Sequence, residues 1–234
     1  YRSIFYRSAA AFFLMIALLL PAYRFARAEA SGEPSELTGR CAFALPERSA
    51  AFAARLTDAR YNSRISFKKG EALEIAVPDG AAGLYVAWYT APEAAGIEAL
   101  GADGAVLTAA MADPSLLNGY YPLPAGCASV RIASEKEFAV SEVRVFDTKA
   151  PPDELCVMGV QKAQPKVMVI LAHTADESYH FGSLLPYLSG SDAALVFLSS
   201  ESRQAQQQAI EARYALGSRT QPVFGSVPFY RTTL

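Results

Sequence analysis

Hydrophobic residues follow two different spacings along this chain, and the change falls near Pro151-Pro152. Before that point, short segments such as residues 73–77 alternate apolar and polar side chains, which is typical of strands with one buried face. Turn-forming sequences such as Pro78-Asp79-Gly80 separate these segments. Several short strands at this spacing predict an antiparallel β-sandwich over residues 37–148.

A different pattern begins after a predicted linker at residues 149–165. Segments of two types then alternate: apolar, strand-like runs at 167–172 and 193–199, and helical patterns at 178–188 and 203–216. The first run is continuously apolar, which is typical of a central parallel strand covered on both faces. Gly217 is suited to end the second helix. This order predicts a second domain over residues 166–234, a truncated α/β, Rossmann-like layer of parallel strands.

The most distinctive polar residues come directly after the first of these apolar runs. Ligands bind past the carboxyl ends of strands in open α/β sheets, and the chain there reads Ala172-His173-Thr174-Ala175-Asp176-Glu177. This segment resembles the PIG-L family of zinc-dependent N-deacetylases, whose motif reads Ala-His-Pro-Asp-Asp-Glu. The resemblance implies that His173 and Asp176 bind zinc, beside Glu177, in an enzyme that removes acetyl groups from N-acetylated amino sugars.

Two features of that family are missing from this sequence. The position of the family's general base is occupied by Ala175, which cannot accept a proton. The family's third zinc ligand is a downstream histidine, whereas the two histidines here are His173 and His180. We therefore expect an incomplete copy of the deacetylase domain, with no catalytic residue at the base position and with weak zinc binding or none.

The same residues also have interpretations that need no metal. Thr174 and Glu177 are spaced as a capping box, and Asp176 would interact well with the dipole of the helix that follows. His180 lies four residues after Asp176, so both would share a helix face and could hold a metal together. The alternative for His180 is a histidine with a local hydrogen bond, which the missing third ligand favours.

The predicted sandwich has a resemblance of its own. Residues 56–67, together with residues 141–146, are similar to discoidin-like (galactose-binding-like) domains. The resemblance implies that loops at one end of the sandwich bind a carbohydrate. Tyr120 and Tyr121 lie between a glycine and a proline, which predicts a loop and makes them candidates for glycan binding. Trp88 alternates with inward strand positions, so we expect it to fill the core.

The N-terminal residues predict export. An apolar run at 9–22 follows two arginines and precedes small-x-small sequences at 26–28 and 28–30, so residues 1–30 have the form of a signal peptide. The alternative is an uncleaved anchor, the chain's only expected attachment to a membrane. A secreted or cell-surface protein could form a disulfide, most simply Cys41–Cys127 with Cys156 left free, or its three cysteines could all stay unpaired.

Charge narrows the possible functions further. The 234 residues have a formal net charge of −2 and no run of lysines and arginines, which argues against nucleic-acid binding. Two functional classes remain. One is an exported, impaired N-deacetylase-like protein that acts on N-acetylated amino sugars. The other is a non-catalytic glycan-binding module of the cell surface that carries a degenerate deacetylase remnant, and Ala175 favours this class.

Overall fold

The computed structural model describes residues 33–46, 50–160, 164–174, 193–199 and 202–225. The chain divides into two compact units, Tyr1–Ser35 and Glu36–Leu234, and the described strands and helices belong to the second. No helix within the described ranges is long and apolar enough to cross a membrane. The predicted signal peptide or anchor lies outside those ranges.

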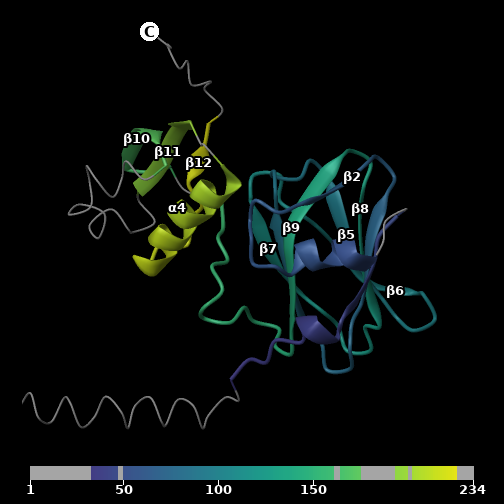
Figure 1. Cartoon of the computed structure of the whole chain (residues 1–234). Helices are drawn as coiled ribbons and strands as arrows, with labels where there is room; N and C mark the ends of the chain where they lie inside the picture. The colour runs from purple at the N-terminus through teal and green to yellow at the C-terminus, as the bar shows by residue number, and fades with distance from the viewer. Residues whose placement is uncertain (1–32, 47–49, 161–163, 175–192, 200–201, 226–234) are drawn as a thin grey trace, which may run out of the picture. The chain divides into compact units, whose positions relative to one another are not determined.

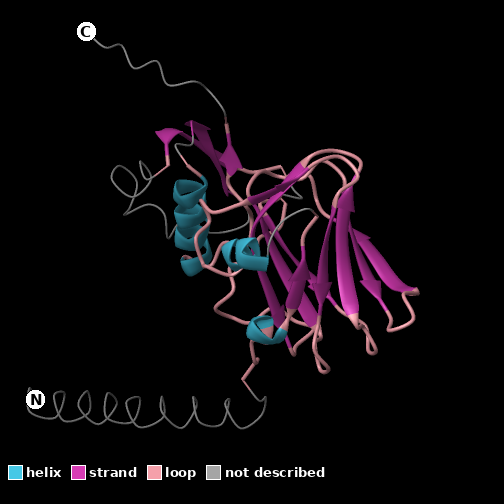
Figure 2. Cartoon of the chain, turned by 45° about the vertical axis from the view of Figure 1, so that its right-hand side comes forward, coloured by secondary structure: helices cyan, strands magenta, loops and turns pink. Residues whose placement is uncertain are grey.

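Nine antiparallel strands form two sheets that face each other (Figures 1 and 2). The five-stranded sheet has the order β1 (Ala42–Ala44), β3 (Ala72–Ala76), β8 (Ser129–Ser134), β5 (Ala95–Leu100) and β6 (Val106–Met111). The four-stranded sheet has the order β2 (Ile65–Phe67), β9 (Phe138–Phe146), β4 (Gly83–Trp88) and β7 (Asn118–Pro122). Two short 3-10 helices, η1 (Thr38–Arg40) and η2 (Ala50–Leu56), accompany the strands. The predicted antiparallel β-sandwich is confirmed.

One hydrophobic core fills the space between the two sheets. Strands β3, β5 and β8 alternate buried and more exposed residues, because successive side chains of a strand point to opposite faces. Trp88 is 1% exposed and meets the ring of Phe138 edge-on, with 6.4 Å between the ring centroids. Phe67 stacks on the same ring at 4.7 Å. The expectation that Trp88 belongs to the core is confirmed.

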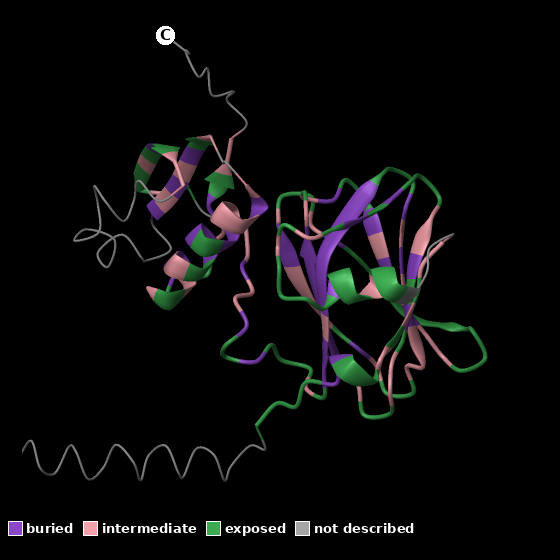
Figure 3. Cartoon of the chain, viewed as in Figure 1, coloured by how far each residue is buried: buried purple, intermediate pink, exposed green. Residues whose placement is uncertain are grey.

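The four-stranded sheet is buried on its outer face as well. All six residues of β4 are buried, as are most residues of β9, which is largely purple in Figure 3. Tyr85, Ala87 and Phe146 form a second apolar cluster with Leu155. Leu155 comes from residues 149–165, which we predicted to be a linker. This segment packs on the sandwich instead of crossing solvent, because its apolar side chains cover the sheet.

A short parallel sheet follows the sandwich in the sequence. Its order is β10 (Val167–His173), β11 (Ala193–Ser199) and β12 (Val223–Phe224). Helix α4 (Arg203–Ala215) connects β11 to β12, and its first turn is capped by the Ser202 hydroxyl, which accepts a hydrogen bond from the Ala205 N–H at 3.1 Å. Gly217 follows the helix with φ of +87°, the left-handed conformation expected there.

The expectations for this sheet hold in part. The strands are parallel, but β10 lies at the edge of the described sheet, and Met168 and Ile170 are each 57% exposed. The expectation of a strand covered on both faces is therefore not met within the described ranges. The helix predicted at 178–188 falls outside them, so the Rossmann-like layer stays a prediction.

Two expectations about the sandwich differ from the structure. Tyr120 and Tyr121 lie on β7 and not in a loop, because they pair with Tyr85 and Leu84 of β4. The β propensity of two tyrosines, together with this pairing, outweighs the flanking glycine and proline. The three cysteines are free thiols, so the structure contains no Cys41–Cys127 disulfide. Burial raises the pKa of the Cys41 thiol to about 11, which keeps it protonated at neutral pH.

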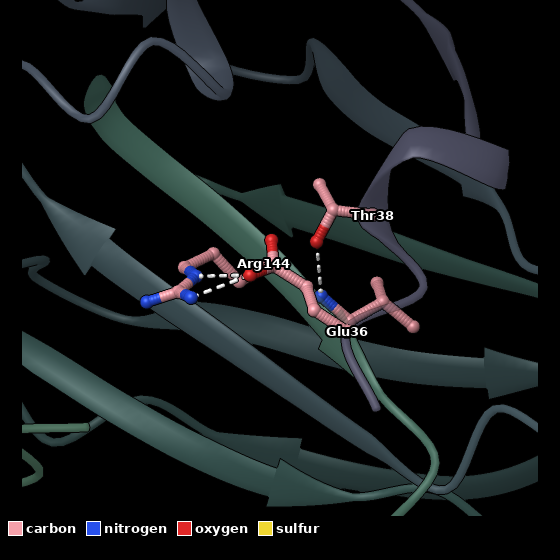
Figure 4. Close-up of polar contacts among 4 residues, drawn as sticks. Glu36, Thr38 and Arg144 are labelled. Carbon is pink, nitrogen blue, oxygen red and sulfur yellow. Dashed lines mark hydrogen bonds and ion pairs between the residues drawn. The ribbon is translucent and has the colours of Figure 1, made fainter. Parts of the chain in front are cut away.

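The chain enters the sandwich along β9 (Figure 4). The Thr38 hydroxyl, in a residue only 6% exposed, accepts a hydrogen bond from the Val145 N–H at 2.9 Å. Beside it, Arg144 Nε donates to the Glu36 carboxylate at 3.1 Å. Burial raises the pKa of Glu36, but the hydrogen bonds from Arg144 and Thr38 outweigh it and hold the pKa below its usual value.

The Thr38–Val145 hydrogen bond can be tested by a substitution of equal shape. Thr38→Val removes the acceptor and leaves the Val145 N–H buried without a partner, so we expect the free energy of unfolding to fall by about 1–3 kcal/mol. Urea denaturation measures this loss. Thr57→Val, at an exposed threonine, is the matched control and should change stability by less than about 0.5 kcal/mol. Equal effects of the two substitutions would contradict a specific role for Thr38.

Candidate functional site

A pocket of about 570 Å³ opens where β4 ends and β7 begins. Its walls come from three places: the segment after β4, the segment before β7, and residues that follow the sandwich in the sequence. The lining residues are Tyr89, Thr90, Ala91, Pro114, Ser115, Leu116, Leu117, Val160, Gln206, Gln221, Pro222, Val223 and Phe224. None of these described residues carries a charge. The pocket therefore suits an uncharged ligand.

The segment before β7 is held in one conformation by side-chain hydrogen bonds. The Gln221 amide accepts from the Leu117 N–H at 2.7 Å and donates to the Ser115 carbonyl at 2.8 Å. Asp113 accepts from the Ser115 N–H at 2.9 Å, and its hydrogen bonds with Ser115 lower the pKa of the Asp113 carboxyl. This wall of the pocket is therefore formed before any ligand arrives.

Arg203, the first residue of α4, connects the helix to both strand ends at the pocket. Its side chain donates from Nε to the Trp88 carbonyl at 2.8 Å and from Nη2 to the Leu117 carbonyl at 3.3 Å. A third bond, also from Nη2, is donated to Oε1 of the Gln207 side chain at 3.2 Å. Arg203 is only 3% exposed, so it positions the pocket's walls and does not line the pocket.

A sealed polar cluster surrounds this guanidinium. Its central carbon lies 5.2 Å from the centre of the Tyr61 ring, and Tyr85 and Glu142 are only 1% and 5% exposed. Burial raises the pKa of Tyr61 to about 12 and the pKa of Tyr85 well above its usual value. Burial also raises the pKa of Glu142, whose Oε2 has no hydrogen-bond partner within the described ranges. Tyr85 and Glu142 are buried, and burial favours the neutral forms of all three groups, so the cluster supports the fold.

Tyr89 supplies the aromatic surface of the pocket. Its backbone N–H donates to the Ala139 carbonyl at 2.8 Å, which extends the pairing of β4 with β9 by one residue. The Arg64 guanidinium lies 4.2 Å from the ring centre, a cation–π contact that fixes the ring. Tyr89 is half-buried, so the residue is both anchored and partly accessible.

The predicted metal site can be followed only in part. His173 is the last residue of β10 and pairs with Ser199 of β11, so it lies at the carboxyl end of a parallel strand as predicted. The other predicted residues, Ala175, Asp176, Glu177 and His180, lie outside the described residues. Within the described ranges, no group of three histidine, cysteine, aspartate or glutamate residues could hold a metal. The zinc ligands therefore stay a prediction.

The two tyrosines predicted to bind glycan do not line the pocket. The Tyr120 hydroxyl donates to the Thr148 carbonyl at 2.6 Å, and burial raises its pKa to about 12. Tyr121 packs against the sandwich core, where burial likewise raises its pKa to about 12 and its hydroxyl oxygen accepts a hydrogen bond from the Trp88 indole. Both hydroxyls are committed within the protein, and their role in binding stays a prediction.

Sequence reasoning missed Gln221 and Arg203 as residues of the pocket and its support. One local signal was present. A cation in the first turn of a helix interacts unfavourably with the helix dipole, so Arg203 at the start of α4 indicates a partner elsewhere in the protein. Nothing in the sequence identified that partner as the carbonyl groups at the ends of β4 and β7.

Comparisons with solved structures return distant likenesses. A fucose-binding module of Streptococcus pneumoniae, SpX-3, is 18% identical at a TM-score of 0.38, over 47% of this chain and 96% of that one. The family 32 carbohydrate-binding module of C. perfringens NanJ, solved with galactose, is 10% identical to this chain, with a TM-score of 0.37. The match covers 48% of this chain and 98% of that module. A His 62 mutant of the lectin binding domain of lectinolysin, solved with Lewis b, is 11% identical to this chain, with a TM-score of 0.35. The match covers 46% of this chain and 91% of that domain.

No family model and no curated protein matches the chain. The assignment to the antiparallel β-sandwich class therefore rests on the observed strand order, and the resemblance to PIG-L deacetylases stays a prediction.

The buried carboxyl of Glu142 predicts a pH-dependent stability. A carboxyl whose pKa is higher in the folded than in the unfolded state binds more protons when folded, so stability falls as pH rises from the unfolded to the folded pKa. We expect Glu142→Gln, which cannot ionise, to melt at a higher temperature than the unmodified chain at pH 7. The difference in melting temperature between the two proteins should shrink as the pH falls below the pKa of Glu142 in the unfolded chain.

Thermal melts across a pH series measure the effect. Glu137→Gln, at an exposed position, controls for the loss of one negative charge and should leave the pH profile unchanged. A lower melting temperature for Glu142→Gln at pH 7 would mean that the ionised carboxylate stabilises the cluster, contrary to this account.

Proposed function

We propose that the chain is a non-catalytic carbohydrate-binding module that holds a neutral sugar in the pocket between β4 and β7. The observation that carries this proposal is the lining itself: an uncharged pocket of about 570 Å³ that combines an anchored tyrosine with amide, hydroxyl and apolar groups. This volume is in the range of ~300–1,000 Å³ that is common for small-molecule sites. Sugars present apolar C–H faces and a rim of hydroxyls, so they need this mixture.

The lining residues divide into two groups by their chemistry. Tyr89, Pro222 and Phe224 supply apolar surface, and Phe224 is itself stacked on Phe197 with 5.6 Å between ring centroids. Thr90 supplies a hydroxyl and Gln206 an amide at the same pocket. Hydroxyl and amide groups of this kind can exchange hydrogen bonds with a sugar. The Gln221 amide holds the segment before β7.

The lining favours binding over bond cleavage. The described lining contains no carboxylate, imidazole or thiol, the groups that most often act as general acid or base. Arg203 and Glu142, which are buried beside the pocket, do not line it. A ligand would therefore be held and released unchanged.

We further infer a secreted or cell-surface location, where such a module would meet glycans and amino-sugar conjugates. This inference is supported by the apolar run at 9–22 with its preceding arginines.

We also propose that residues 166–234 are a remnant of a zinc-dependent deacetylase layer. Two observations favour this: the parallel pairing of β10, β11 and β12 with α4 between the last two strands, and the position of His173 at the carboxyl end of β10. His173 is the only member of the predicted ligand set within the described ranges, so the proposal includes no zinc chemistry. Ala175 at the base position argues that the remnant is inactive.

Sugar binding can be measured by calorimetric titration with galactose, fucose and N-acetylglucosamine. We expect saturable binding of at least one of these sugars. Tyr89→Ala should raise its Kd about tenfold, a loss of ~1.4 kcal/mol, because the aromatic contact is removed. Galacturonate should bind more weakly than galactose, since the described pocket lining holds no cation for its carboxylate.

Tyr120→Ala is the matched control, because Tyr120 is a half-buried tyrosine of the sandwich that does not line the pocket. Circular dichroism should confirm that both variants are folded. A loss of binding in Tyr120→Ala with none in Tyr89→Ala would move the site to β7. Absence of binding to every neutral sugar tested would reject the proposed function.

The deacetylase remnant has its own test. A positioned general base contributes about a hundred- to ten-thousand-fold in rate, so Ala175 should leave no measurable release of amine from N-acetylglucosamine derivatives. Chelator-washed protein should hold much less than one zinc per chain. Stoichiometric zinc that disappears in His173→Ala, or robust turnover that disappears in Asp176→Ala, would show that the site is complete.

A further inference from the structure

Strand β6 is the outermost strand of the five-stranded sheet and is exposed along its whole length. All six of its residues are exposed, including Val106 at 56%, Leu107 at 44% and Met111 at 63% (Figure 3). Strand β6 ends the strand order of its sheet, and Figure 1 shows it at the right-hand edge of the sandwich. This strand therefore contributes little to the core and offers a sheet edge to solvent.

The composition of β6 lacks the features that normally protect such an edge. Natural edge strands are kept short, or carry lysine, proline or a bulge. The sandwich's other three edges follow this rule: β1 and β2 have three residues each, and β7 ends in Pro122. Strand β6 has six residues without charge or proline, and its one irregularity lies near its start, opposite Ala99 and Leu100.

The hydrogen bonds to β5 show which backbone groups of β6 face outward. The Ala112 N–H donates to the Ala95 carbonyl at 2.9 Å, and residues of an antiparallel strand alternate between the two sides. Thr108 and Ala110 therefore direct their N–H and C=O groups to β5. Ala109 and Met111 direct theirs to the free edge, where a further strand can pair.

We propose that β6 is a self-association edge, which pairs antiparallel with β6 of a second copy of this chain about a two-fold axis at Ala109. In this register Ala109 lies opposite Ala109 of the second copy, and its outward N–H and C=O can exchange both hydrogen bonds. Thr108 then lies opposite Ala110 of the second copy, so the pairs beside the axis are small. Leu107 lies at the irregularity of β6, outside this regular ladder.

The charges near the axis permit this pairing. Glu98 lies opposite Ala109 in β5, so two copies would bring two such carboxylates toward the axis. The Arg131 guanidinium lies 3.5 Å from the Glu98 carboxylate and offsets its charge. An identical partner is favoured over an unrelated peptide because the small residues beside the axis and the outward backbone groups are complementary to themselves. The resulting dimer would present two sugar pockets.

Sedimentation equilibrium over a concentration series tests the association. The mass should rise from 25.1 kDa toward twice that value with increasing concentration. Ala109→Pro removes an outward N–H without affecting the bonds to β5, and Met111→Lys places a charge on the edge. Either change should abolish the dimer. Phe52→Lys, at another exposed apolar residue, is the control and should leave it intact, as should Tyr89→Ala.

The register has an independent test by cysteine cross-linking. Under mild oxidation, Ala109→Cys should form a disulfide-linked dimer, because residues that face each other in an antiparallel pair have Cα atoms about 5.5 Å apart, within disulfide range. Ala110→Cys should not, since it would face Thr108 of the second copy. The unmodified chain controls for its own three cysteines. A monomer at every concentration, or a dimer unaffected by both Ala109→Pro and Met111→Lys, would overturn the proposal.

Discussion

Burial of the four-stranded sheet on both faces is the constraint on which the rest of this structure depends. Its inner face meets the five-stranded sheet, and its outer face is covered by residues that follow the sandwich. Covering the outer face requires a partner for each backbone and side-chain polar group enclosed there. The Arg203 guanidinium meets much of this requirement, since it satisfies carbonyls at the ends of β4 and β7 and lies over the Tyr61 ring.

Burying a guanidinium carries a cost of several kcal/mol, which hydrogen bonds must offset. Three bonds from Arg203 are present, and one nitrogen, Nη1, has no partner within the described ranges. Glu142 is similarly incomplete, with one buried oxygen unpaired. Because both buried groups are incompletely paired, we infer that they add little stability. Their main effect is to fix the position of α4 against the ends of β4 and β7. It also fixes the two segments that line the pocket.

The pocket and the β6 edge illustrate opposite uses of a β-sandwich. At the pocket, loops are immobilised by bonds from distant residues, so a ligand meets a preformed, uncharged surface. At β6, no further strand pairs with the outer edge within the described ranges, and apolar side chains are exposed. The first arrangement favours recognition of a small neutral molecule, and the second favours addition of another strand.

Much of the local structure was determined by the sequence alone. Period-two alternation predicted the sandwich, the position of Trp88 among inward residues placed it in the core, and Gly217 marked the end of α4. These features depend on neighbouring residues, so a local pattern is enough to predict them. The likeness of residues 172–177 to a metal-binding motif is also local, but its ligands need partners that the sequence does not show.

Other features were decided only by the tertiary structure. Tyr120 and Tyr121 belong to a strand because β4 lies beside them, and Leu155 of the segment predicted as a linker is buried because it packs on the apolar outer face of the sheet. Arg203 bonds a carbonyl 115 residues away, and Gln221 an N–H 104 residues away. No periodicity connects positions so far apart, since only the folded chain brings them within hydrogen-bond distance.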